Sequence, residues 1–505
     1  MSDWMTTIVA PNPDPPDPPD PMTVAIGEAA RSGYPSDPPF DPAEIPLEMR
    51  GAMTRTDPAN ASYATVRQAF ALMRLDAGHQ GSADWNPLGD VIRPGDRVLV
   101  KPNLVRHFHG DGAGLEALVT HGSVIRAVLD YAALALKGTG SITVGDSPLQ
   151  YSDFNAVLGT IGLDRVMEHV SGWSGVPIRG VDFRRERSEK RGALIVTRVR
   201  NKSEPGGYHV VDLGGRSRFA GATDEQCSRF RVTQYDPKTM RRAHGGATHA
   251  YFIPDTVLAA DVVINVPKLK THRKAGLTAA MKNLVRINGS KDWLPHHTFG
   301  AKDDGGDEYA RSSLRKRAIS RLRDAIEARR SVAARRLLRV IEQGIKATGR
   351  IIPFPDPFWE GSWSGNDTLW RMVHDLHTVL FFADRAGVLK DVPQRRYLAV
   401  VDAIVAGEGE GPMRPARRAA GLIVAGAGPA AVDTVCCRLM GFDESRVPLL
   451  RHAADAAFHP RLPGASEIRI ASQDDRWNDL FTRKRAETLR FAPPAAWAGA
   501  LEMER

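Results

Sequence analysis

Basic side chains gather directly after the most apolar predicted strand of the chain, residues 260–266. In the segment VPKLKTH, Lys268, Lys270 and His272 follow that strand, and Lys282 and Asn283 come soon afterwards, beside a predicted helix start. Neighbouring ammonium groups lower one another's pKa, and they attract carboxylates and phosphates. The cluster therefore predicts a site for a small anionic ligand, where a lysine could act as a base or form a Schiff base.

Three further apolar runs also end in polar side chains. Lys101 and Asn103 follow RVLV, Asp146 follows ITV, and acidic side chains follow LAVV, namely Asp402, Glu408 and Glu410. Ligands of open α/β sheets bind beyond the carboxyl ends of the strands, so we expect these side chains to meet the basic cluster in one crevice. The carboxylates there could act as acid and base, or hold a hard divalent cation.

Each group of candidate residues receives a predicted role. The predicted catalytic residues are Lys268, His272, Lys282, Asp402 and Glu408. The candidate metal ligands are Asp146, Asp402, Glu408 and Glu410. The predicted substrate-binding residues are Lys101, Asn103, Lys270, Thr271, Asn283, Trp363, Asn366 and Arg371.

Simpler explanations exist for several of these patterns. A single lysine after a strand is often a solvated loop residue, and Asp146 and Asp402 could cap the turns that follow them. The glycines of GEGEGP, residues 407–412, let the backbone come close to a ligand, but they also suit an ordinary turn. His374 and His377 share a helix face and could bind zinc or iron, although core or surface histidines are the commoner case.

One segment carries about the whole net charge of +9: residues 311–350 hold thirteen Lys or Arg against three acidic residues. Its apolar residues have helical spacing, which predicts a solvated helix packed on the core or a helix resting on anionic lipid or glycan. The tryptophans that follow, at positions 359, 363 and 370, could stack on sugar rings or form the small core of a lid.

The elements that must position these residues alternate between predicted helices and strands. This order predicts an α/β fold with a mixed, largely parallel sheet flanked by helices, and a mainly helical insertion. The expected divisions are a proline-rich disordered leader and linker (1–60), a first core part (61–300), the insertion as a lid (301–390), a second core part (391–475) and a tail (476–505).

Composition argues against several classes of protein. The three cysteines, Cys227, Cys436 and Cys437, cannot form a disulfide framework or ligate an iron–sulfur cluster. AGAGPAA, residues 425–431, departs from the strict dinucleotide-binding pattern, and there is no specific nucleic-acid motif. No run approaches the roughly 20 apolar residues of a membrane span, and the start does not resemble a secretory signal, so we expect a cytoplasmic protein.

Five motifs in order resemble the DUF362 family, a family named for its unknown function. They are VLVKPNLV, VGDSP, ADVVINVPKLKTH with GLTAAMKNLVRING, VVDAIVAGEGEGP and AGPAAVDTVCCRLMG, between Val98 and Gly441. The resemblance implies that the family's hallmark positions are Lys268, Lys270, His272, Lys282, Asn283, Asp402, Glu408, Gly411, Pro412 and Asp433. Some members add a ferredoxin-like module with cysteine motifs, which this chain lacks, so electron transfer is disfavoured.

Three functions are consistent with these patterns. The leading one is an enzyme that acts on a small phosphorylated or carboxylated molecule in the strand-end crevice. One alternative is a hydroxy-acid racemase or epimerase with a metal-bearing cofactor, as in the lactate racemase group that DUF362 distantly resembles. The other is a non-catalytic binder of an anionic glycan or polyphosphate. The sequence leaves the substrate, the reaction and the oligomeric state open.

Overall fold

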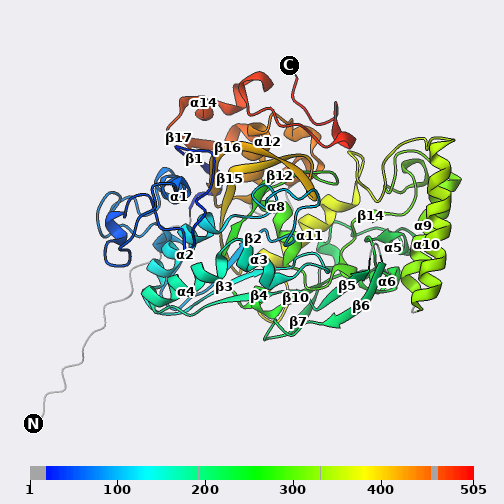
Figure 1. Cartoon of the computed structure of the whole chain (residues 1–505), viewed down its shortest axis with the longest axis horizontal. Helices are drawn as coiled ribbons and strands as arrows, with labels where there is room; N and C mark the ends of the chain where they lie inside the picture. The colour runs from blue at the N-terminus through cyan, green and yellow to red at the C-terminus, as the bar shows by residue number, and fades with distance from the viewer. Residues whose placement is uncertain (1–18, 192–193, 330, 456–463, 505) are drawn as a thin grey trace, which may run out of the picture.

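One large mixed sheet organises the computed structural model, which describes residues 19–191, 194–329, 331–455 and 464–504 (Figure 1). Most of its strand pairs are parallel, and the pairs of β16 with β1 and β15 are antiparallel. The strand order is β17 (Arg469–Ser472), β1 (Thr23–Glu28), β16 (Arg414–Gly426), β15 (Arg396–Glu410), β11 (Val262–Val266), β2 (Arg97–Pro102), β3 (Ser141–Asp146) and β4 (Ile178–Asp182). The predicted α/β class is confirmed.

Both faces of this sheet are buried, which is why its strands consist of β-branched and aliphatic residues. Leu99 packs into one core, whereas its neighbours Val98 and Val100 pack into the other. The second core is covered by α1 (Ala61–Leu72), α2 (Gly122–Leu136), α3 (Phe154–Thr160) and α4 (Leu163–Ser174). The first is covered by α7 (Asp255–Ala259), α8 (Ala280–Asn283), α11 (Thr368–Phe382), α12 (Pro429–Leu439) and α13 (Pro448–Arg451).

The segment VPKLKTH forms a strand of its own and not the basic loop expected from the sequence. After Pro267, β12 (Lys268–His272) pairs with the distal part of β15 in parallel and with β13 (Gly276–Thr278) in antiparallel. All five residues of β12 are buried. Pro267 provides no N–H for a ladder, so the chain leaves β11 and resumes pairing further along β15.

Short antiparallel sheets and helices surround the large sheet. The sheets combine β7 (Tyr208–Asp212), β10 (Thr248–Pro254) and β9 (His244–Gly245); β14 (His297–Thr298) and β8 (Phe230–Arg231); and β5 (Glu186–Arg191) and β6 (Leu194–Arg200). The helices among and beside them are α5 (Asp224–Ser228), α6 (Pro237–Ala243) and α14 (Asp475–Asn478). No described helix is long and apolar enough to cross a bilayer.

The expected insertion, 301–390, divides into two structurally different parts. α9 (Leu314–Ala328) and α10 (Val332–Ala347) form a helical hairpin at the right-hand edge of the molecule (Figure 1). Ser313 and Ser331 are the N-cap residues of the two helices, and the hydroxyl oxygen of each accepts a hydrogen bond from a backbone N–H of the first turn. α11, in contrast, is a core helix, because Leu369, Val373 and most of its other apolar residues pack beneath the sheet.

The chain ends contribute more to the core than the sequence indicated. The expectation of a disordered leader through residue 60 is wrong for Thr23–Glu28, because β1 pairs with both β16 and β17 inside the sheet. The prolines of residues 1–18 lie outside the described residues. The expected tail also packs into the core, where Trp477, Phe491 and Trp497 are fully buried. Period-2 alternation in TVAIGE was the available signal for β1, but it is short and follows the proline-rich run.

Candidate functional site

A basic cavity of about 420 Å³ lies where β3, β4, β12 and β15 end. Its wall combines the loop after β3, the turn after β12, α8, the segment 285–296, residues 232–234 and the residues that follow β15. This is the position that the strand-end rule indicates for ligands of α/β sheets. The cationic side chains of the wall are Arg184, Arg273, Lys274, Lys282, Arg286 and Lys291.

Protein partners already bind three of these cations. Arg184 forms an ion pair with Asp182 at 2.5 Å, and Arg286 lies 3.3 Å from Asp146. Lys274 donates a hydrogen bond to the backbone oxygen of Glu360, the cavity's acidic residue within the described chain. Burial raises the pKa of Glu360, but the charges of Arg323 and Lys274 outweigh that effect and lower it below its ordinary value.

Lys291 lies over the ring of Tyr235, at 5.8 Å, so Lys282 and Arg273 are the cations that remain available to a ligand. Neither side chain forms a hydrogen bond or ion pair with another described residue. Burial lowers the pKa of Lys282 to about 7, and the charges of Arg286 and Lys274 act in the same direction. A carboxyl group bound at its first turn fixes the helix that carries Lys282, because Asp433 accepts the N–H groups of Ala280 at 2.5 Å and Met281 at 3.1 Å. Lys282 is therefore a positioned amine that can change protonation near neutral pH.

Two histidines of the cavity wall have opposite hydrogen-bonding roles. The Nδ1 atom of His272 accepts the N–H groups of Lys274 and Ala275, both at 3.1 Å, so the neutral ring carries its proton on Nε2. The Nδ1 atom of His296 lies 2.8 Å from the backbone oxygen of Leu294 and must donate, so its Nε2 is an acceptor. Burial and the nearby lysines hold the pKa of both rings well below the ordinary value. His272 is thus a hydrogen-bond donor, and His296 is an acceptor.

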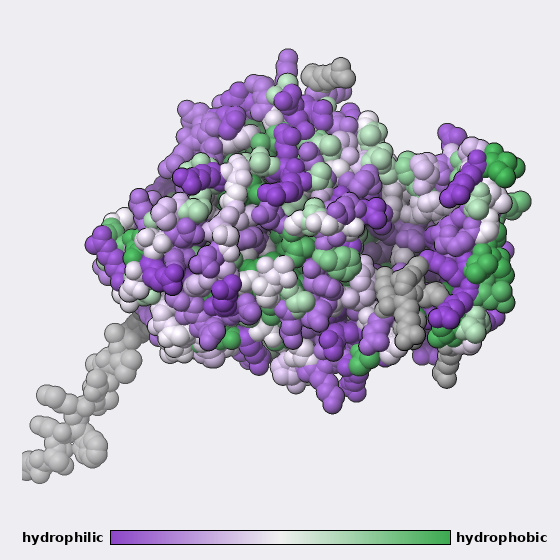
Figure 2. All heavy atoms as spheres, viewed as in Figure 1, coloured by the Kyte–Doolittle hydropathy of each residue, from purple (hydrophilic) through white to green (hydrophobic). Residues whose placement is uncertain are grey.

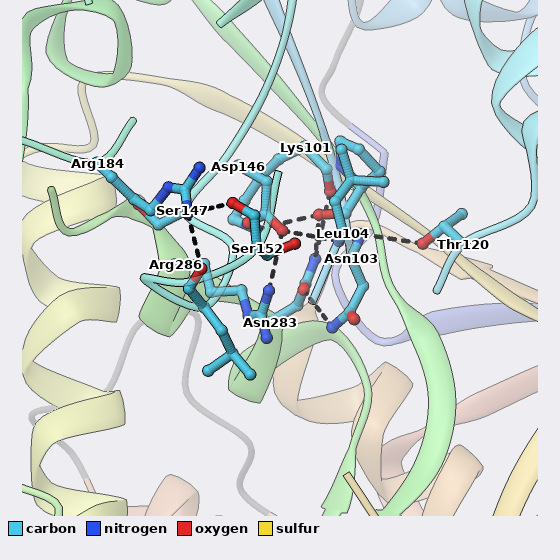
Figure 3. A network of polar contacts seen from close by, with 12 residues as sticks. Lys101, Asn103, Leu104, Thr120, Asp146, Ser147, Ser152, Arg184, Asn283 and Arg286 are labelled. Carbon is cyan, nitrogen blue, oxygen red and sulfur yellow. Dashed lines mark hydrogen bonds and ion pairs between the residues drawn. The ribbon is translucent and has the colours of Figure 1, made fainter. Parts of the chain in front are cut away.

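Beneath the cavity, several predicted site residues form a buried polar network (Figure 3). The Lys101 ammonium lies 2.7 Å from Asp146, whose other oxygen accepts the N–H of Leu104 at 2.7 Å. Burial lowers the pKa of Lys101 to about 8, although Asp146 opposes the shift. Because Arg286 also reaches Asp146, the network supports one cation of the cavity wall from below.

Asparagines extend the network towards β12. Asn103 donates to the side-chain oxygen of Asn283 at 2.9 Å, and Asn283 donates to that of Asn265 at 2.8 Å. Lys270 donates to Asn103 at 3.2 Å and to the backbone oxygen of Leu118. Burial, together with Arg286 and Lys268, lowers the pKa of Lys270 well below its ordinary value. Its two acceptors match the two hydrogens of a neutral amine.

Lys268 and Asp402 form an ion pair away from the cavity wall, at 2.6 Å, and neither side chain is exposed. Tyr34 donates to Asp402 at 2.5 Å, accepts from Lys268 at 2.6 Å and stacks on His121. The N–H of His121 gives Asp402 a third donor at 2.9 Å. Tyr34 comes from the predicted leader, so nothing local in the sequence linked it to this pair.

Glu408 and Glu410 hold the C-terminal segment. Their side chains accept the N–H groups of Ala492 at 3.0 Å and Ala495 at 2.8 Å. Five residues of β15 lie between Asp402 and Glu408, and the two carboxylates have different partners: Asp402 binds Lys268, whereas Glu408 binds the C-terminal segment. Asp146 has different neighbours again, so the structure does not bring the four candidate metal ligands together.

The glycines of GEGEGP allow two strands of this protein to approach each other. A Cβ atom on Gly411 would lie 1.9 Å from the backbone oxygen of Thr271, and one on Gly407 would lie 2.9 Å from the Cβ of Lys270. The Thr271 hydroxyl donates to the backbone oxygen of Gly409 at 2.8 Å. These contacts place the close approach between β12 and β15, where the sequence suggested a ligand.

The three predicted residues of the tryptophan-rich segment do not line the basic cavity. The Trp363 indole donates to Asp307, Arg371 pairs with Asp367, and the Asn366 amide donates to the backbone oxygen of His296 at 3.0 Å. Asn366 therefore acts on the cavity through His296. His374 contacts the backbone oxygen of Leu449 at 2.9 Å, as a core histidine does.

Of the predicted catalytic and substrate-binding residues, the structure places His272 and Lys282 in the cavity wall. Sequence reasoning missed Arg273, Lys274, His296 and Glu360 as wall residues. Arg273 and Lys274 directly follow VPKLKTH, so extending that motif by two residues would have found them. Glu360 and His296 carried no usable signal, because they reach the cavity from separate loops.

The chain is similar to one known protein family and to a protein of Synechocystis sp.. Residues 216–438 match the model of the family described as "Domain of unknown function (DUF362)", which confirms the resemblance. The thylakoid-associated protein sll1697 of Synechocystis sp. is 27% identical over 216 residues, which are 43% of this chain. The match spans 46% of that relative's length, which is less than half.

A solved structure is distantly similar. It is the crystal structure of a Thermotoga maritima protein from a structural genomics consortium, with a TM-score of 0.31 and 8% identity. The likeness covers 76% of this chain and 60% of that one, and at this TM-score it supports no conclusion about fold or function.

Proposed function

With residues 216–438 matching a DUF362 domain, we propose that the protein is an enzyme acting on a small phosphorylated or carboxylated molecule bound in the basic cavity. The observation that carries the proposal is Lys282: a half-buried amine in the cavity wall, without a partner among the described residues, whose pKa is lowered to about 7. Catalytic bases are effective when their pKa lies near the working pH.

Anion binding follows from the charges of the wall. Arg273 and Lys282 are the available cations, while Arg286 stays close to the carboxylate of Asp146 and Lys274 donates to the backbone oxygen of Glu360. The Nε2–H group of His272 adds a neutral donor. A carboxylate or phosphate bound here exchanges water for donors that are already positioned.

Proton transfer is the chemistry that the remaining groups favour. Near neutral pH Lys282 is partly the free amine, and in the complexes in which it stays unprotonated it can accept a proton from carbon or oxygen of the bound molecule. A bound anion stabilises the charged form of Lys282 after the transfer. The Nε2 lone pair of His296 can orient a hydroxyl group of the same molecule.

A thermal-shift screen tests the binding part of this proposal. Phosphorylated sugars, nucleotides and hydroxy acids are added to the full chain, and a ligand at one hundred times its Kd adds about 2.7 kcal/mol to the stability. The stabilisation is expected to fall strongly in Lys282→Met, whereas Lys238→Met, which changes an exposed lysine on α6, keeps it. If no anion stabilises the wild type, or if Lys282→Met responds equally, the proposal fails.

Exchange of substrate protons with solvent tests the catalytic part. The ligand found by the screen is incubated with the protein in D2O, and NMR follows deuterium entering a C–H bond next to a carboxylate or carbonyl. Exchange is expected with the wild type and absent with Lys282→Met. Tight binding with neither proton exchange nor any other turnover of the ligand would favour the non-catalytic binder of glycan or polyphosphate.

The racemase alternative stays a prediction with its own test. It requires a metal-bearing cofactor, so purified protein without nickel or zinc, whose stability does not change on chelation, would contradict it. The solvent-exchange experiment separates the two enzymes further, because a racemase also inverts the configuration of the exchanged carbon.

A further inference from the structure

The outer face of α10 is apolar. Leu337 is 64% exposed and Val340 is 69% exposed, and Ile341 beside them is 44% exposed. The stripe continues past the helix end to Ile351 and Ile352, at 85% and 65%. Figure 2 shows hydrophobic residues along the right-hand edge, where Figure 1 places α9 and α10. An exposed, contiguous apolar stripe on a helix indicates a missing partner.

The inner face of α10 is charged, which is the reverse of an ordinary surface helix. Glu342 is fully buried and pairs with Arg323 of α9 at 3.0 Å and with Lys346 at 2.7 Å. Arg335 pairs with Glu327 of α9 at 3.0 Å. These ion pairs fix the orientation of α10, so the helix cannot turn its apolar face towards the protein without breaking them.

Unpaired cations border the stripe. Arg336 lies on its edge and Arg350 precedes Ile351; neither forms an ion pair with a described residue. The acidic residues of 311–350 are all engaged: Glu342 and Glu327 as above, and Asp324 with Arg231 at 3.0 Å. The outer face of the hairpin therefore combines apolar side chains with positive charge alone.

We propose that this face of the hairpin lies on an anionic membrane surface. Helices of this kind lie in the plane of the interface, with their apolar face among the acyl chains and their cations at the anionic headgroups. A second copy of the chain is the weaker occupant, because a two-fold contact would bring the uncompensated arginines of both copies together. An anionic membrane surface matches both features of this face, because its acyl chains accommodate the apolar side chains and its headgroups attract the cations.

Vesicle flotation of the full chain tests the proposal. The vesicles consist of phosphatidylcholine with phosphatidylglycerol, or of phosphatidylcholine alone. The protein is expected to float with the anionic vesicles and to float less at high salt. Leu337→Asp and Val340→Asp should each weaken the partitioning by about tenfold or more, because the apolar side chain no longer enters the interface. Arg336→Gln should weaken it by about fivefold.

Matched controls are available elsewhere on the surface. Val388 and Val392 are 54% and 64% exposed, so Val388→Asp and Val392→Asp add the same charge at the same kind of position outside the hairpin. Both should float as the wild type does, and so should Lys282→Met, which separates this proposal from the function of the cavity. Melting curves establish that each variant is folded.

Three results would overturn the proposal. The first is that the wild type does not float with anionic vesicles. The second is that Leu337→Asp and Val340→Asp float unchanged, because charge alone would then hold the protein and any polyanion would explain the binding equally. The third is that light scattering shows a dimer that Leu337→Asp dissociates, while vesicles have no effect. The third result would assign the stripe to a second copy.

Discussion

Replacing Asp402 by asparagine tests whether the Lys268–Asp402 pair is structural. Both side chains are inaccessible to solvent. The carboxylate accepts hydrogen bonds from the Tyr34 hydroxyl and the backbone N–H of His121, and it forms the ion pair with the Lys268 ammonium. Removing one partner of a buried ion pair usually costs about 3–5 kcal/mol of folding free energy. An upper limit on the loss comes from the alternative in which Lys268 becomes neutral in the folded variant. Removing the proton from a lysine of ordinary pKa at pH 7 costs about 5 kcal/mol. We therefore expect Asp402→Asn to lose about 3–5 kcal/mol.

Urea unfolding followed by tryptophan fluorescence measures the loss. In the variant, Lys268 loses the carboxylate that raises its pKa, so the folded state holds fewer protons than the unfolded state between neutral pH and the ordinary lysine pKa of 10.5. Stability then rises with pH across this range, and the deficit against the wild type should shrink. This slope distinguishes a buried charge from a simple loss of packing.

Two controls sharpen the result. Asp111 and Arg414 form an exposed ion pair at 3.6 Å, where Asp111→Asn should change stability by less than about 1 kcal/mol. The double variant Lys268→Met with Asp402→Leu removes both charges, and it should be less destabilised than the sum of the single variants. A loss below about 1 kcal/mol in Asp402→Asn would refute the structural role and return the pair to the list of catalytic candidates.

Three other predictions concern the cavity, the strand contact and the C-terminal segment. Affinity for an anionic ligand should fall as pH rises above about 7, where Lys282 loses its proton, and calorimetry should show proton uptake on binding that Lys282→Met abolishes. Gly411→Ala should destabilise the fold by about 2 kcal/mol or more, because its Cβ would lie 1.9 Å from the Thr271 oxygen. Gly172→Ala, in helix α4 with open space around it, should be neutral or stabilising by about 0.5 kcal/mol in the same urea assay. Deleting residues 476–505 should abolish cooperative unfolding, because Trp477 and Trp497 are core residues; a normal melting curve would contradict this packing.

The sequence was most informative where pattern and chemistry are local. Apolar runs ending in polar residues predicted strands β2, β3 and β11 and the edge of the sheet at which the cavity lies. The basic cluster predicted His272 and Lys282, since closely spaced cations in one segment stay close whatever the wider fold. The helical spacing within 311–350 predicted helices there, and the structure has α9 and α10.

Tertiary structure decided which of the predicted residues share the cavity. Lys268 and Lys282 belong to one motif, yet β12 buries the first against Asp402 while α8 presents the second to the cavity. Alternation along a strand places successive side chains on opposite faces, and the face that becomes buried depends on its neighbours in the sheet.

By itself, then, the sequence determined the α/β class, the strand-end position of the cavity and the positive charge of VPKLKTH, because each follows from residue types within one segment. Tertiary structure alone decided that Tyr34 seals the Lys268–Asp402 pair, that Glu360 and His296 enter the cavity wall, and that α10 turns its apolar face outwards. These outcomes depend on contacts between segments far apart in the chain, and the free energy of such contacts is set by burial and pairing in the folded protein.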